Sequence, residues 1–215
     1  MSKHKKFRHR DKSNNEHLTT ERNYDLKLIE KKEVNISKEC DIKSTCDFKG
    51  IMPAKIDKPY PSIQVENKNE YYADLLSRDF CGEVSEFTAI AQYVNHELRF
   101  SLKYCEIAKT LLSISRTEMT HFEMIGKLIT LLGGTVSYTA STPFGLTIWC
   151  GDFVDLGYDF AAMIQADIDG EIQAIEQYRS HIEKIDDPCI NAILRRIIED
   201  EEYHIELLNN LIKEL

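Results

Sequence analysis

A pattern of glutamate and histidine occurs twice in the second half of the 215-residue chain. Glu118 and His121 are three residues apart, and Glu201 and His204 repeat this spacing 83 residues later. Residues three apart lie on the same face of an α-helix. Apolar residues share these faces, so the polar side chains are expected to point into a core. Because buried charge needs a partner, this pattern strongly limits the folds available to the chain.

A second repeat relates the two segments that precede these motifs. Six positions recur 85 residues apart, with Glu86, Ala89, Ile90, Gln92, Tyr93 and His96 corresponding to Glu171, Ala174, Ile175, Gln177, Tyr178 and His181. Internal similarity at a fixed offset indicates a duplicated structural unit. The chain therefore predicts a bundle that is duplicated two helices at a time.

Helical sequence fills most of the chain from Tyr71 onward. No proline occurs between Tyr71 and Gly133, and apolar residues recur every three or four positions. A break is predicted near residues 99–104, because one helix of about 60 residues would be too long for a domain of this size. The glycines at positions 133 and 134 are expected to end the second helix.

A long connection and two further helices are predicted next. Residues 135–152 are rich in Ser, Thr and Gly, which favours an irregular crossover. A third helix is expected from about Phe153 to Ile185 and a fourth from about Ile190 to the end, because Pro188 separates them. The predicted fold is an all-α, ferritin-like antiparallel four-helix bundle with a long crossover between helices two and three.

Residues 1–66 differ in composition from the rest of the chain. They are rich in Lys, Glu, Asn, Ser and Asp and sustain no apolar period, so they bury too little to offset their ordering entropy. We expect residues 1–66 to form a disordered or extended tail and residues 67–215 to form the bundle. The basic first twelve residues could contact an acidic surface.

Charge and cysteine content exclude several classes of protein. The formal net charge of −9 argues against a nucleic-acid partner. Without a long apolar stretch or an apolar leader, no membrane partner is predicted and a cytoplasmic location is expected.

The six cysteines contain no C-x-x-C pair and are predicted to be reduced thiols. Cross-linking of chains through Cys40 and Cys46 in an oxidising layer is the alternative.

Metal ions would resolve the conflict between charge and burial. Two divalent cations would neutralise inward-facing carboxylates and accept imidazole nitrogens as ligands. The pattern matches a described dimetal arrangement, with a Glu from each of two helices and a Glu-x-x-His from each of the other two. The predicted metal ligands are Glu86, Glu118, His121, Glu171, Glu201 and His204.

The motif helices resemble those of bacterioferritins, rubrerythrins and manganese catalases. The resemblance rests on residues 118–121 (EMTH) and 200–204 (DEEYH) and extends over about residues 70–215. It implies a site for two Fe or two Mn ions, in which each histidine binds one ion. It further implies that Glu118 and Glu201 bridge the ions as the catalytic ligands, and that Glu86 and Glu171 cap them.

The resemblance also implies contacts behind the ligands. Asp200 would orient the histidine of the opposite motif, whereas Thr117 occupies the matching place in the other motif. An Asp200 that faces solvent is the alternative. Tyr93 and Tyr178 could hydrogen-bond ligand carboxylates or could be ordinary core residues.

Three residues match a pattern without being assigned to the site. His96 and His181 are rotated away from the inward face, so they are interpreted as structural or exposed. Met119 stands where bacterioferritins place a haem-ligating methionine, but a lone helical methionine usually serves packing. We therefore do not predict haem.

The sequence departs from the rubrerythrin pattern at one ligand position. Rubrerythrins usually carry another glutamate one turn from the third-helix ligand. Ile168 and Ala174 stand at the corresponding places here, and Asp167 is only a distant substitute. The rubrerythrin-type movement of iron is therefore not expected.

The leading functional hypothesis is a non-haem dimetal oxidoreductase acting on oxygen or hydrogen peroxide, of the peroxidase, catalase or ferroxidase type. Without a rubredoxin-type domain, electrons would come from a separate protein, or the reaction would be a disproportionation. An iron-storage ferritin-like protein and a structural coat or assembly protein with a retained metal site are the alternatives. A homo-oligomer, dimeric or larger, is expected.

Overall fold

The computed structural model describes residues 46–214, most of which lie in helices. Its α-helices are α1 (Glu70–Cys81), α2 (Glu86–Phe100), α3 (Cys105–Leu131), α4 (Phe160–Lys184) and α5 (Pro188–Leu211). Two strands, β1 (Thr139–Thr142) and β2 (Gly145–Ile148), and two short 3₁₀ turns, Gly151–Phe153 and Ile212–Glu214, complete the described elements. Within this part of the chain no helix combines the length and apolar character needed to cross a membrane.

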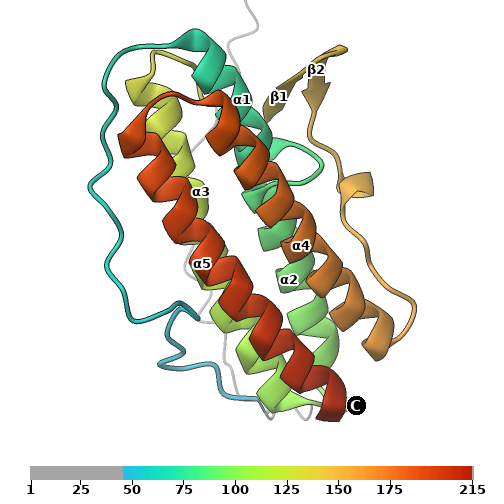
Figure 1. Ribbon diagram of the computed structural model, residues 1–215. Coiled ribbons are helices and arrows are strands. Elements are labelled where there is room, and N and C mark those ends of the chain that lie inside the picture. The colour runs from blue at the N-terminus through green and yellow to red at the C-terminus, as the bar shows by residue number, and fades with distance from the viewer. Residues whose placement is uncertain (1–45, 215) are drawn as a thin grey trace, which may run out of the picture. The chain divides into compact units, whose positions relative to one another are not determined.

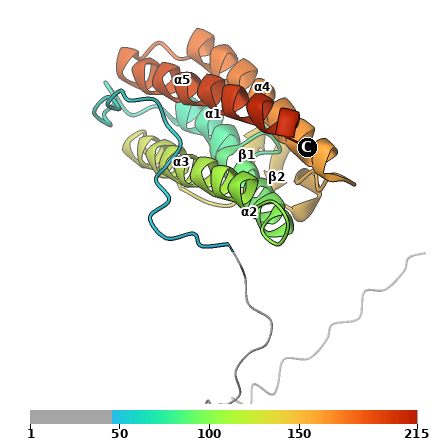
Figure 2. The same cartoon turned by 90° about the horizontal axis from the view of Figure 1, so that it is seen from below.

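The helices form the predicted antiparallel four-helix bundle. Helices α1 and α2 follow each other in one direction and together make its first member, while α3 returns beside them (Figure 1). Because α3 and α4 run in the same direction, the chain must cross the length of the bundle between them. Helix α5 then runs back along α4 (Figure 2). This connectivity confirms the predicted ferritin-like fold.

A break between α1 and α2 was not predicted. Gly82 follows α1, and a Cβ atom there would lie 2.7 Å from the carbonyl oxygen of Arg78. Ser85 caps α2 by accepting a hydrogen bond from the amide of Thr88 at 3.2 Å, and its hydroxyl donates to the Gly82 carbonyl at 2.8 Å. The predicted break near residues 99–104 is present between Phe100 and Cys105.

The crossover is more ordered than the predicted irregular connection. Strands β1 and β2 form an antiparallel hairpin, and its turn includes Gly145 with φ of 121°. The third bundle helix begins at Phe160 rather than near Phe153, because Asp159 caps α4 by accepting from the amide of Ala162 at 2.8 Å. The serine-, threonine- and glycine-rich composition of residues 135–152 did not reveal the pairing of β1 with β2.

Two apolar clusters form the core, with a polar layer between them. One cluster contains Ile125 and Ile197, and the other contains Ile114 and Leu208. On α3, Glu118 lies between Ile114 and Ile125 in the chain and is itself buried. The packing of both clusters thus holds the polar layer at the centre of the bundle, away from water.

Residues 46–66, the described part of the predicted tail, lack helices and strands but contact the bundle. The amide of Ala54 donates to the carbonyl of Ser113 at 3.0 Å, and the amide of Glu66 donates to Asp187 at 2.8 Å.

Cys46 forms a disulfide with Cys105, so the prediction of reduced thiols is wrong for this pair. Cys40 and the basic first twelve residues lie outside the described residues.

We predict that breaking the disulfide destabilises the fold. The bond closes a loop across a sequence separation of 59 residues. Restricting the unfolded chain in this way typically contributes about 2–4 kcal/mol, so Cys105→Ser should lower the free energy of unfolding of the metal-free protein by that amount. Denaturant titration would measure the change. Cys189→Ser, which alters a free cysteine, is the control; equal midpoints for both variants would contradict the prediction.

Candidate metal centre

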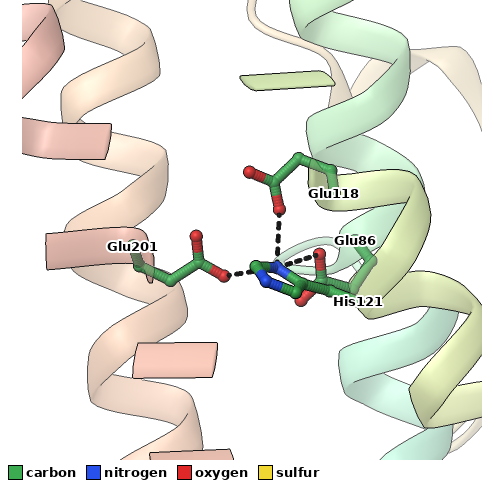
Figure 3. Close-up of side chains that lie close together, drawn as sticks. All are labelled: Glu86, Glu118, His121 and Glu201. Carbon is green, nitrogen blue, oxygen red and sulfur yellow. Dashed lines mark hydrogen bonds and ion pairs between the residues drawn. The ribbon is translucent and has the colours of Figure 1, made fainter. Parts of the chain in front are cut away.

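The six predicted ligands converge in the polar layer of the bundle. Every one of these side chains is buried, with exposure of 3% or less. Helices α2 and α4 each supply one glutamate, and α3 and α5 each supply a Glu-x-x-His pair. Figure 3 shows one part of this layer, where His121 lies among the carboxylates of Glu86, Glu118 and Glu201.

Two overlapping groups could each hold a metal ion. The first contains Glu86, Glu118, His121 and Glu201, and the second contains Glu118, Glu171, Glu201 and His204. Within each group the potential ligand atoms lie within 4.8 Å of one another. Two carboxylates belong to both groups, which is the geometry needed for ligands that bridge two ions.

Both histidines present the same nitrogen to the carboxylates. Nδ1 of His121 lies 3.3 Å from Glu118 and 3.2 Å from Glu201. Nδ1 of His204 lies 2.9 Å from each of the same two carboxylates. In each ring Nε2 points away from this centre, so Nδ1 is the nitrogen available to an ion.

The centre contains buried atoms with unmet bonding capacity. Oε2 of Glu86, Oε1 of Glu118, Oε2 of Glu201 and Nδ1 of His204 have no partner in hydrogen-bond geometry within the described part of the chain. Some of them lie at ion-pair distance, as His204 Nδ1 does from Glu118 and Glu201, but a buried polar atom without a well-aligned hydrogen bond is costly. Cations would satisfy them, and this mixture of carboxylate oxygen and imidazole nitrogen suits iron or manganese.

The carboxylates of the centre differ in the direction in which their pKa values are shifted. Burial and the neighbouring Glu201 and Glu118 raise the pKa of Glu171 to about 8. Burial and Glu118 likewise raise the pKa of Glu86. Burial alone would also raise the pKa of Glu118, but His204 and His121 beside it lower it well below its ordinary value. Protons thus occupy part of the centre in the metal-free protein.

Asp200 contacts the histidine of the opposite motif. Its Oδ2 lies 3.1 Å from Nε2 of His121 and accepts a hydrogen bond from the hydroxyl of Tyr60 at 2.6 Å. Its Oδ1 lies 2.7 Å from Arg196. Asp200 has no exposed surface, so the alternative of a solvent-facing carboxylate is wrong.

The other histidine has a different partner, which sequence analysis missed. Nε2 of His204 donates to the backbone carbonyl of Ala54 at 2.7 Å. Thr117, at the place that matches Asp200, donates its hydroxyl to the same carbonyl at 2.9 Å. Every residue carries a carbonyl, so nothing in the composition of residues 46–66 marked Ala54 or Tyr60 as contacts of the centre.

The two repeated tyrosines contact the capping glutamates in a crosswise arrangement. Tyr93 of α2 donates to Glu171 of α4, and Tyr178 of α4 donates to Glu86 of α2. Both tyrosines are buried. They therefore restrain the orientation of these two carboxylates.

The repeated histidines are buried, each beside an aspartate, so the alternative that they are exposed is wrong. His96 lies 2.9 Å from Asp167, and His181 lies 2.8 Å from Asp79. Neither histidine belongs to the two groups that could hold a metal ion. Asp167 also accepts from Gln92 at 3.0 Å, which commits it to this pair rather than to a ligand role.

A cavity of about 280 Å³ between α2 and α4 extends to the centre. Glu118 and Glu201 form part of its wall, together with acidic residues nearer its margin such as Glu83, Asp155 and Asp169. Among the described residues that line it there is no lysine, arginine or histidine. The cavity therefore favours cations and uncharged molecules over anions.

Comparison with known proteins identifies relatives of this arrangement. A family model described as a ferritin-like domain matches residues 84–215. The chain is 24% identical over 171 residues to a probable manganese catalase of Clostridium acetobutylicum, covering 71% of this chain and 75% of that protein. It is 33% identical over 129 residues to a bacterioferritin of Streptomyces coelicolor, covering 58% and 71% of the two chains.

Solved structures share the fold. KatB, a manganese catalase from Anabaena, superposes with a TM-score of 0.66 at 22% identity, over 74% of this chain and 78% of its own. The Mycobacterium tuberculosis bacterioferritin BfrA superposes with a TM-score of 0.56 at 26% identity, over 68% and 87% of the two chains. Both likenesses concern the helical-bundle fold.

We predict that metal affinity rises with pH because protons and cations compete for Glu171. Its pKa of about 8, against an ordinary 4.5, means that the carboxyl holds a proton through most of this interval. Apparent Mn²⁺ affinity should rise about tenfold per pH unit for each displaced proton between about pH 5 and 8. Titrations at constant ionic strength would measure this slope. A constant affinity over that range would contradict the prediction.

Proposed function

This chain belongs to the ferritin-like domain family, and we propose that it is a binuclear metal oxidoreductase acting on hydrogen peroxide or oxygen. One observation carries the proposal: two groups of buried ligands share Glu118 and Glu201. Two ions that shared these carboxylates could act on one small molecule together. Relatives named manganese catalase and bacterioferritin support this class of centre.

The chain's own residues would hold and position the pair. Glu118 and Glu201 would bridge, Glu86 with His121 would complete one position, and Glu171 with His204 would complete the other. Bound manganese or iron would supply reversible electron transfer, which no side chain of the centre provides. Tyr93 and Tyr178 would hold the capping carboxylates in place through their hydrogen bonds.

The surroundings of the centre restrict its substrate. The apolar clusters at both ends of the polar layer exclude water along the bundle axis. In the described part of the chain, the cavity between α2 and α4 offers an approach to the centre, and its acidic wall opposes anions. Hydrogen peroxide and oxygen are small and uncharged at neutral pH, so they fit this approach.

Peroxide disproportionation is the reaction that we favour. It converts two molecules of hydrogen peroxide into two of water and one of oxygen, so it needs no electron donor. Ferroxidase activity is a second candidate, because the acidic cavity would also admit Fe²⁺ and a bacterioferritin is 33% identical over 129 residues. In that reaction oxygen or peroxide would be the oxidant, and each Fe²⁺ would lose one electron.

We predict that gas exchange separates the two reactions. Mn²⁺-loaded protein given hydrogen peroxide should release one oxygen molecule for every two peroxide molecules consumed, which an oxygen electrode measures. Metal-free protein given Fe²⁺ in air should instead consume oxygen if ferroxidase activity dominates. If neither metal form consumes peroxide or oxygen faster than the same concentration of free metal, the proposed function is wrong.

We predict that the shared glutamates determine metal content. Glu118→Gln and Glu201→Gln keep the side-chain size but remove a charge and a bridging oxygen, so bound metal should fall below two ions per chain and activity should fall with it. Glu123→Gln is the matched control, because Glu123 lies on the same helix and is 67% exposed. Elemental analysis of purified protein measures the stoichiometry. Two ions and parental activity in both shared-glutamate variants would refute the assignment.

A further inference from the structure

A segment outside the matched domain lies against the two motif helices. We call residues 52–60 the strap; they run past the α3 and α5 side of the bundle (Figures 1 and 2). On α3, the strap amide of Ala54 donates to Ser113 at 3.0 Å. On α5, the strap carbonyl of Lys58 accepts from Arg196 at 2.8 Å, and the Lys58 ammonium lies 2.5 Å from Glu199. The strap is thus fixed to both helices that carry histidine ligands.

The strap contacts the two histidines by different chemistry. At one, the neutral Ala54 carbonyl accepts directly from Nε2 of His204. At the other, Asp200 accepts from His121, while the strap supports Asp200 through the amide of Ile56 at 2.9 Å and the hydroxyl of Tyr60 at 2.6 Å. One imidazole is therefore backed by a carbonyl and the other by a carboxylate.

Whether a carbonyl or a carboxylate lies behind a histidine affects how strongly that histidine binds a metal ion. A carboxylate behind a ligating histidine fixes its tautomer and raises its basicity, and removing such a partner typically weakens metal binding 10–100-fold. A carbonyl also fixes the tautomer, but a hydrogen bond to a neutral acceptor is weaker than one to a charged acceptor. Arg196 offsets part of the Asp200 charge through the oxygen that does not face His121.

We propose that the strap is a positioning element that makes the two metal positions unequal. The Ala54 carbonyl holds His204 with Nδ1 toward the carboxylates, in the role that Asp200 performs for His121. The position completed by His121 then binds the first ion, and the position completed by His204 binds the second ion more weakly. This inference rests on the proposed dimetal function.

The proposal is tested by titrating the full-length metal-free protein with Mn²⁺ alone. Electron paramagnetic resonance distinguishes a single Mn²⁺ from a coupled pair, so it reports the two binding steps separately. In the parent protein the steps should be resolved, with an isolated-ion signal at one equivalent. Two indistinguishable steps would overturn the inference, whereas failure to bind Mn²⁺, Fe²⁺ or Co²⁺ at all would overturn the proposed function instead.

Ala54→Leu is the informative variant, because Ala54 is 9% exposed and a larger side chain would displace its carbonyl. We expect the second binding constant to weaken about 10–100-fold while the first changes less than about threefold. Gln64→Leu introduces the same side chain at an exposed position outside the strap and should change neither constant. Equal weakening of both steps by Ala54→Leu, or no weakening, would overturn the strap's role.

A rescue experiment separates positioning from general damage. Thr117 precedes Glu118 as Asp200 precedes Glu201, so Thr117→Asp would present a carboxylate to His204 from α3. Combined with Ala54→Leu, it should restore the second constant to within about threefold of the parent. A second constant that stays weak in this double variant would overturn the role assigned to the carbonyl.

A measurement on the parent protein avoids dependence on folding of the variants. In Zn²⁺-loaded protein, nitrogen-15 nuclear magnetic resonance reports which ring nitrogen of each histidine carries the proton. We expect a slowly exchanging Nε2–H on His204, consistent with donation to Ala54, and metal bound at Nδ1. A proton on Nδ1 of His204, or a rapidly exchanging Nε2–H, would overturn the inference.

Discussion

Burial of four carboxylates and two imidazoles in one helical core is the constraint on which the rest of the structure depends. These side chains are at most 3% exposed, so water cannot offset their charge. Two cations would offset this charge, but only if all four bundle helices present their ligands to one centre. That requirement explains the polar layer between two apolar clusters, and the long crossover allows α3 and α4 to run in the same direction.

The ligands could be predicted from the sequence because they obey local rules on strongly periodic helices. Glu118 and His121 share a helix face through their spacing alone, and the duplication relates them to the second motif. The contact of Ala54 with His204 spans 150 residues and uses a carbonyl that any residue provides, so no residue type signals it. The Cys46–Cys105 bond likewise follows no spacing motif.

The duplication is preserved close to the centre even where the sequences diverge. His96 pairs with Asp167, and His181 pairs with Asp79, so both halves bury a histidine beside an aspartate. The two aspartates do not occupy matching positions of the 85-residue repeat: Asp167 lies within α4, whereas Asp79 lies in α1 before the break at residues 82–85. Because of the unpredicted break, Asp79 of α1 can contact His181 of α4. Asp167 of α4 makes the corresponding contact with His96 of α2.

The duplication is lost one layer further out, where the histidines meet the strap. Thr117 and Asp200 occupy equivalent positions but present a hydroxyl and a carboxylate, and the Ala54 carbonyl takes the place of the second carboxylate. The chain on either side of the strap is tied to the bundle, at Cys46 and at Glu66, and the strap precedes the matched domain at residues 84–215. Because hydrogen bonds behind a ligand tune its metal, proteins with the same six ligands can differ in metal binding through a segment that the shared domain does not contain.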